Sequence, residues 1–168
     1  DEIDAARDVT KNNTYRVDTF VSRDLGPLGY ADSDRIVFYR HSLKRNTAHS
    51  EFDVSNLSTL PKVDIVYAYQ EADRAPIDAL VKAGAKGIVL DDNADGFPAA
   101  TKAGQAKGVV FVMTTRTRSG RVQDTPRRRE SHIVAGDDLQ PEKARLLLQL
   151  ALTKTTDLNE IKRIFDEY

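Results

Sequence analysis

The sequence contains no cysteine, which excludes disulfide bonds, thiolate metal sites and cysteine nucleophiles. No stretch approaches the roughly 18 apolar residues of a membrane-spanning helix, and the first twenty residues lack the apolar core of a signal peptide. The 25 basic and 26 acidic residues nearly balance, so no net charge attracts nucleic acid or an anionic membrane. These absences predict a soluble protein with no membrane partner and make nucleic acid an unfavoured one.

The first 61 residues predict an extended arm and a linker. Residues 1–18 are polar and have no helical period, while residues 9–19 alternate loosely, which favours a hairpin with Asn12 and Asn13 in its turn. Turn signals follow around one short predicted strand at residues 35–40. We therefore expect residues 1–61 to precede a single α/β domain at residues 62–168, a length sufficient for one real core.

Apolar and β-branched runs alternate with helical patterns from Val63 onward. They predict strands at residues 63–69, 86–90 and 109–115, with helices at 75–83 and 98–107 between them. Gly84 follows the first helix as a C-terminal glycine should. This order predicts a three-layer α/β domain with a mainly parallel sheet, similar to Rossmann or flavodoxin folds, and ligands bind such sheets beyond the carboxyl ends of the strands.

Two helices are predicted at the end of the chain. Pro141 suits a first helical turn, where its missing amide hydrogen has no partner to lose, and residues 144–152 are apolar almost all round. Asp157 and Glu160 have the spacing of a capping box for a final amphipathic helix. We expect both helices to pack on the sheet.

Five blocks of sequence, in order and spacing, resemble the C-terminal half of bacterial type II L-asparaginases. They are Ala-Arg-Asp-Val-Thr-Lys at residues 6–11, Thr-Ala-His-Ser-Glu-Phe-Asp-Val at 47–54, Leu-Pro-Lys-Val-Asp-Ile-Val-Tyr at 60–67, Pro-Glu-Lys-Ala-Arg at 141–145 and Ile-Phe-Asp-Glu-Tyr at 164–168. The resemblance covers nearly the whole chain. It implies an amidohydrolase that converts asparagine to aspartate and ammonia, and that often accepts glutamine.

The resemblance also implies that the catalytic groups lie elsewhere. The family's nucleophilic threonine, in a Thr-Gly-Gly-Thr segment, and its second threonine, aspartate and lysine belong to an N-terminal half, and none of those segments occurs in these 168 residues. We therefore expect no catalytic residue and no activity from this chain alone, and no cofactor. The resemblance implies a homo-oligomer such as a tetramer, a small amino acid such as asparagine as ligand once the other half is supplied, and a periplasmic or secreted setting. The alternative is a non-catalytic binding or interaction module that keeps the fold.

One loop is expected to reach the substrate of a neighbouring subunit. The family places an asparagine there in a glycine-rich loop, and here Gly96 or Phe97 falls at that position, so Asp95, Gly96 and Phe97 are the candidate substrate-binding residues. The family's second contact, a glutamate in an acidic loop, falls on Thr125 within a basic segment. The resemblance thus implies a retained scaffold with changed functional loops.

The changed loops have other interpretations. Residues 91–96 match the first half of an EF-hand loop, but the twelfth position is Lys102 rather than glutamate, so we expect a solvated turn and no metal. Six arginines between Arg116 and Arg129 predict a solvated loop, with an anion site as the alternative. The three histidines have neither zinc spacing nor a cysteine partner.

Overall fold

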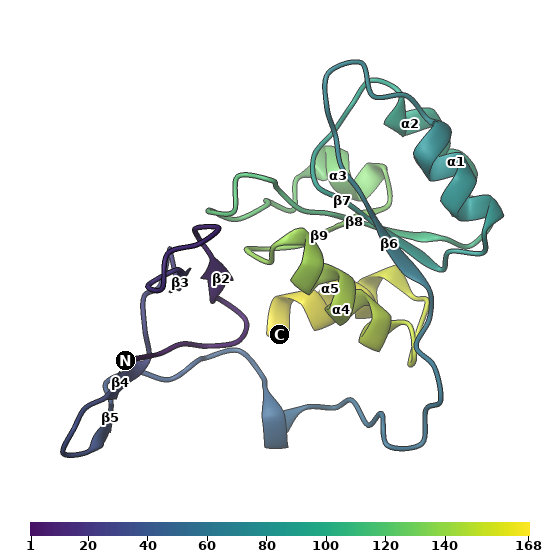
Figure 1. Ribbon diagram of the computed structural model, residues 1–168. Helices are drawn as coiled ribbons and strands as arrows, with labels where there is room; N and C mark the ends of the chain where they lie inside the picture. The colour runs from purple at the N-terminus through teal and green to yellow at the C-terminus, as the bar shows by residue number, and fades with distance from the viewer. The chain divides into compact units, whose positions relative to one another are not determined.

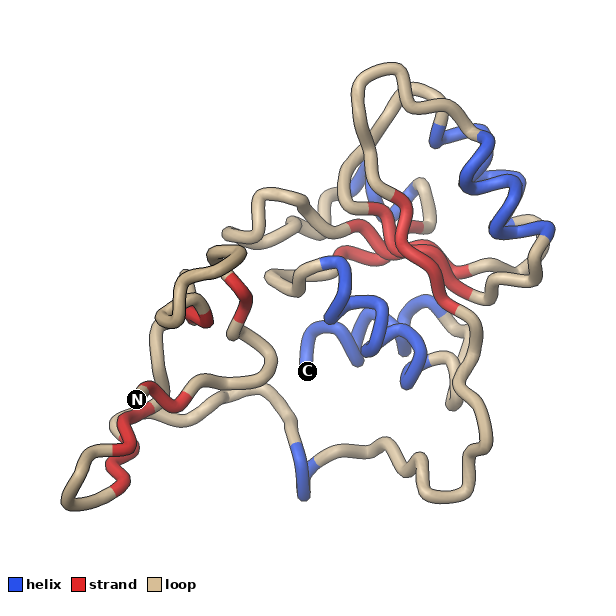
Figure 2. Tube along the Cα trace, in the orientation of Figure 1, coloured by secondary structure: helices blue, strands red, loops and turns tan.

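The computed structural model describes residues 1–168, which form two compact units, Asp1–Thr47 and Ala48–Tyr168. Short strands build the first unit, and an α/β sheet domain forms the second (Figures 1 and 2). Residues 48–61 group with the α/β unit here, whereas the sequence pattern placed them in the arm. The division of the protein into domains at 61/62 stays a prediction.

The first unit contains two small antiparallel sheets. β1 (Glu2–Ile3), β4 (Gly29–Ala31) and β5 (Ile36–Phe38) form one sheet in the order β1-β4-β5. β2 (Thr10–Lys11) and β3 (Phe20–Val21) form the other as a hairpin. The predicted hairpin is therefore present, although its connection spans residues 12–19 rather than a tight turn, because the Asn13 side chain accepts the amide hydrogens of Tyr15 and Arg16 and so stabilises a wider loop.

The second unit is built on a four-stranded parallel sheet. Its strands are β6 (Val63–Val66), β7 (Gly87–Leu90), β8 (Val110–Met113) and β9 (Ile133–Ala135), in the spatial order β6-β7-β8-β9. The predicted parallel α/β architecture is confirmed. The four strands follow sequence order without the reversal found in Rossmann and flavodoxin sheets, so that closer likeness stays a prediction.

Helices cover both faces of this sheet (Figure 1). α1 (Ala75–Lys82) and α2 (Phe97–Gln105) pack on one face, and α4 (Pro141–Ala151) and α5 (Leu158–Glu167) pack on the other. Side chains of a strand alternate between faces, and β7 shows this directly: Ile88 and Leu90 join the α1 and α2 cluster, while Val89 joins the α4 and α5 cluster. Three layers result, with apolar contacts on each side of the sheet.

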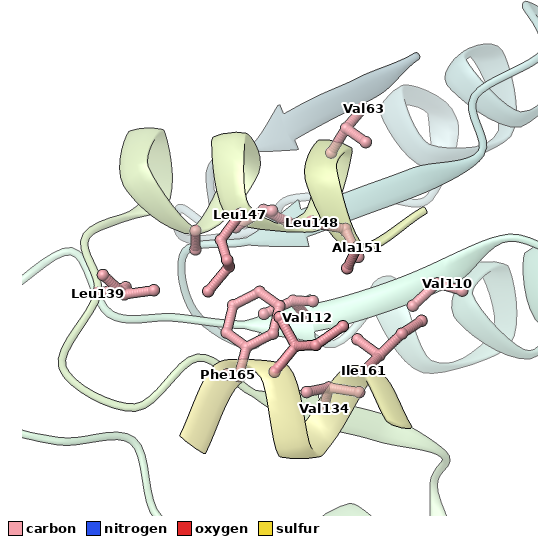
Figure 3. Packing of buried hydrophobic residues seen from close by; sticks show 13 residues of the cluster. Val63, Val110, Val112, Val134, Leu139, Leu147, Leu148, Ala151, Ile161 and Phe165 are labelled. Atoms are coloured by element: carbon pink, nitrogen blue, oxygen red, sulfur yellow. The ribbon is translucent and has the colours of Figure 1, made fainter. Parts of the chain in front are cut away.

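The core beneath α4 and α5 is one of the two apolar clusters of the unit (Figure 3). Leu148, Ile161 and Phe165 are completely buried against the valines of the strands, among them Val112. Burying each large apolar side chain stabilises the fold by about 1.5–3 kcal/mol. Close packing explains Gly87, because a Cβ atom there would lie 2.6 Å from Cδ2 of Leu148.

Two elements between β8 and α4 were not predicted. The basic segment contains a short helix, α3 (Pro126–Glu130), whose first turn is capped by the Thr125 side chain accepting the Arg128 amide hydrogen. β9 follows as a strand of three residues. Neither is long enough for a pattern to be distinguished in the sequence.

The last helix begins as predicted but with half of a capping box. Asp157 Oδ1 accepts the amide hydrogen of Glu160 at 2.9 Å. The reciprocal bond is missing, because the Asp157 amide donates to Thr155 and the Glu160 carboxylate pairs with Arg163. None of the helices in residues 1–168 is both long and apolar enough to cross a membrane.

Candidate functional site

The carboxyl ends of β6, β7 and β8 lie at one edge of the sheet, because these strands are parallel neighbours. The segments that leave this edge begin at Tyr67, Asp91 and Thr114. They bring together the acidic run after β7 and the arginine-rich loop after β8. This edge is where the sequence predicted a ligand site.

Asp91 is the most unusual residue of this edge, because its carboxylate is completely buried. Oδ1 accepts the amide hydrogen of Ala68 at 2.5 Å, and Oδ2 is buried without a hydrogen-bond partner. Burial raises the pKa of Asp91, although the bond from Ala68 and the charge of Arg116 oppose that rise. The expectation of a solvated turn was wrong here: Asp91 closes the end of β7 against β6 and is unavailable to a cation in solution.

The Ala68 peptide is held from both sides. Its amide hydrogen goes to Asp91, and its carbonyl oxygen accepts from Arg116 Nη1 at 3.0 Å. The flanking residues Tyr67 and Tyr69 are 55% and 59% exposed, so neither side chain belongs to the core. Three strand ends are thereby tied together by one buried carboxylate and one arginine.

The three residues predicted to bind substrate have different environments. Asp95 is exposed, and Gly96 precedes α2, where a Cβ atom would lie 2.7 Å from Cα of Asp73. Phe97 is 2% exposed and belongs to the core beneath α1 and α2. Of the three, Asp95 presents a side chain to solvent, and Gly96 can offer only backbone groups.

A separate open pocket of about 380 Å³ lies at the same edge of the sheet. Its lining comes from the start of the acidic loop, from the end of β8 and its following loop, and from α3. The lining residues are Asp92, Asn93, Met113, Thr114, Thr115, Thr117, Ser119, Gly120, Arg121, Val122, Gln123, Thr125 and Arg128. The pocket thus combines hydroxyl groups and two arginines with a single aspartate.

The hydroxyl groups of this pocket are not arranged as nucleophiles. Thr114 Oγ1 is buried and donates to the Leu90 carbonyl at 2.9 Å, which ties β8 to β7. Thr115 and Thr117 share a hydrogen bond of 2.9 Å between their hydroxyls. A hydroxyl nucleophile requires an adjacent base, and neither contact supplies one. Residues 1–168 also contain no group of three histidine or acidic side chains placed to hold a metal ion.

Comparison with known proteins agrees with this fold. The sequence model of the glutaminase/asparaginase C-terminal domain matches residues 62–165. L-asparaginase 2 of Bacillus subtilis is 44% identical, over 100% of this chain and 46% of that protein. A probable periplasmic L-asparaginase of Haemophilus influenzae is 36% identical, over 99% of this chain and 50% of that protein.

A solved structure agrees as well. The crystal structure of a probable cytoplasmic L-asparaginase from Campylobacter jejuni superposes with a TM-score of 0.95 at 37% identity, covering 100% of this chain and 54% of that chain. The chain belongs to the glutaminase/asparaginase family and contains its C-terminal domain. It spans about half the length of the relatives it matches. The family resemblance of the five sequence blocks is therefore confirmed.

Sequence reasoning found the arginines and the threonines of this edge but not their arrangement. It missed the buried role of Asp91 and the pocket between Asp92 and Arg128. A buried carboxylate leaves no local signature, because its donor, Ala68, lies in the segment that follows β6, 23 residues away. The clustering of arginine with hydroxyl residues after β8 was the one available signal.

Proposed function

We propose that this chain is the C-terminal half of an amidohydrolase that converts asparagine, and in the family often glutamine, to the acid and ammonia. The observation that carries the proposal is the match over the full chain to about half of an L-asparaginase. No threonine segment of the family's nucleophile type occurs in these 168 residues. The chain alone is therefore inactive, because no activated nucleophile or proton acceptor is in place.

The surface of the first unit supports the idea of a missing half. Its large apolar side chains are unusually exposed for a structured segment: Val17 is fully exposed, Leu43 is 93% exposed and Phe38 is 62% exposed. Large apolar side chains that a protein leaves exposed together mark interaction surfaces. We infer that the remaining half of the enzyme covers it.

Complementation tests the proposal. The purified chain should release no ammonia from asparagine above the buffer control. Co-expression with the N-terminal half of the Bacillus subtilis relative should produce a complex that releases ammonia. The same half with both threonines of its Thr-Gly-Gly-Thr segment changed to alanine is the matched control. Activity of the isolated chain, or a stable complex without activity, would refute the assignment.

Asp95 is the proposed substrate contact of this half. It is exposed at the loop where the family places its contributing asparagine, and a carboxylate suits the ammonium group of an amino acid. In the complemented enzyme, Asp95→Ala should raise KM for asparagine about tenfold, the effect of losing one charged hydrogen bond. Glu130→Ala, an exposed acid on α3, is the control. Equal KM values for the two variants would remove Asp95 from the site.

The proposed setting is periplasmic or secreted, and the proposed assembly is a homo-oligomer such as a tetramer. The Haemophilus influenzae relative bears a periplasmic name, whereas the Campylobacter jejuni structure bears a cytoplasmic one. Fractionation of the producing cells and light scattering of the complemented enzyme test the two points. Recovery only from the cytosol, or a monomeric mass, would contradict them.

A further inference from the structure

The pocket that includes Arg128 of α3 is lined by both apolar and polar residues. Met113 and Val122, which are 3% and 9% exposed, are its buried apolar lining residues. Hydroxyl groups of Thr115, Thr117 and Thr125 are among the lining residues. A volume of about 380 Å³ is at the lower end of ligand pockets, so the occupant is small.

Arg128 contributes a positive charge to the pocket, and its guanidinium forms no ion pair with a carboxylate. Its guanidinium is partly buried, which lowers its pKa, and it donates to the neutral carbonyl of Gln123. The nearby acid Asp124 is already bound, because it pairs with Lys162 and with Arg129 Nη1 at 2.9 Å. A guanidinium carries five N–H donors, so most of those of Arg128 remain for a ligand.

Arg121 adds a second cation to the pocket lining. Its Nε forms an ion pair with Asp137, whose Oδ1 lies 3.8 Å away, and its side chain is 62% exposed. The only acid of the lining, Asp92, is half-exposed and lies 3.9 Å from Arg116. The lining therefore has two arginines and one aspartate, and because Asp137 outside the lining pairs with Arg121, it is the charge of Arg128 that favours an anion.

We propose that this pocket binds a small carboxylate anion, with Arg128 as the bidentate anchor and Met113 and Val122 against the hydrocarbon part. Arginine forks match carboxylate and phosphate equally in geometry. The apolar lining residues Met113 and Val122 favour the carboxylate, because a carboxylic acid brings carbon atoms that they can contact and inorganic phosphate does not. The proposed site lies entirely within the second unit and uses Arg128 as its anchor, a residue to which the proposed amidohydrolase function gives no role.

The test is a titration of the 168-residue chain with succinate and, separately, with inorganic phosphate, followed by amide chemical shifts at constant ionic strength. Succinate should produce saturable shifts confined to residues 92–93 and 113–128. Phosphate should bind more weakly. Absence of saturable shifts, shifts spread over the surface, or tighter binding of phosphate would overturn the proposal.

Two matched variants test whether Arg128 is the residue that binds the carboxylate. Arg128→Gln should weaken succinate binding about tenfold or more, because it removes the paired charge. Arg127→Gln removes the same charge one residue earlier in α3, from an exposed side chain outside the pocket, and should leave binding unchanged. Equal weakening by both variants would show general charge attraction and reject the site.

A third variant covers the case in which Arg128→Gln disturbs the loop. Arg128→Lys keeps the charge and most of the length but cannot form two parallel hydrogen bonds. It should keep the spectrum outside residues 113–131 and still weaken succinate binding severalfold. Unchanged affinity in Arg128→Lys would contradict bidentate anchoring.

Discussion

The backbone amide of Ala68 donates its hydrogen to the buried carboxylate of Asp91, across 2.5 Å between nitrogen and oxygen. Arg116 Nη1 donates to the carbonyl oxygen of the same residue, Ala68. β6, β7 and the loop after β8 are joined at this point. Asp91, the first residue of the acidic loop, therefore stabilises the ends of β6 and β7 against each other.

Asp91→Ala should destabilise the fold by about 1–3 kcal/mol, the cost of leaving the buried Ala68 amide hydrogen without an acceptor. Urea unfolding followed by circular dichroism measures this. Asp92→Ala is the control, because its carboxylate is half-exposed and lies 3.9 Å from Arg116. It should cost less than about 0.5 kcal/mol. Equal losses for the two variants would show that burial of Asp91 is unimportant.

Asp91 should also make stability depend on pH. Burial raises its pKa in the folded chain above the unfolded value of about 4. Its stabilising contribution is then complete below pH 4 and is lost as pH rises through the folded pKa. Asp91→Asn stays neutral, so its unfolding free energy relative to wild type should be higher at pH 7 than at pH 4. A difference independent of pH would contradict this.

Glu51 should show the opposite pH dependence. The hydrogen bond from Arg163, with a further one from Lys154, lowers the pKa of this carboxyl, against the effect of burial. Its contribution is therefore present above the unfolded pKa, near 4.3, and is lost as pH falls through the folded pKa. Glu51→Gln should cost about 1 kcal/mol at pH 7 and almost nothing in strong acid.

The control for that experiment is Glu130→Gln, an exposed acid on α3. It should change stability by less than about 0.5 kcal/mol at every pH. Denaturant curves collected from strong acid to pH 7 give both comparisons. A loss in Glu51→Gln that persists in strong acid would mean that packing, and not the ion pairs with Arg163 and Lys154, is responsible.

The parallel sheet and its four long helices were predictable because their signals are local. Residues 87–90 are a continuous apolar run that predicts a strand buried on both faces, and residues 63–66 are apolar and β-branched apart from Asp64. Gly84 marks a helix end by its positive φ of 84°. α3 and β9 were not predictable in this way. Five and three residues are too few to show a period, and Thr125 as a cap is visible only once the helix is known.

The candidate site depends on contacts that the sequence order conceals. Asp124 forms an ion pair with Lys162 of α5, more than thirty residues later in the sequence, and is therefore not available to neutralise Arg128. Without that pairing, the arginine-rich segment reads as a solvated loop, and this was the interpretation favoured from sequence. The unpaired cation of the pocket is a property of the tertiary structure.

The contact between Gly87 and Leu148 should behave as a coupled pair. Gly87→Ala places a Cβ atom 2.6 Å from Leu148 Cδ2, so it should cost about 1–3 kcal/mol by overpacking. Leu148→Ala should cost about 2–5 kcal/mol by opening a cavity. In the double variant the new methyl group occupies part of that cavity, so the total loss should be smaller than the sum of the two.

Urea denaturation of wild type, the two single variants and the double variant measures this coupling, with Leu146→Ala, which changes an exposed leucine of the same helix, as the control. Additive losses would mean that α4 does not pack on β7 through this contact.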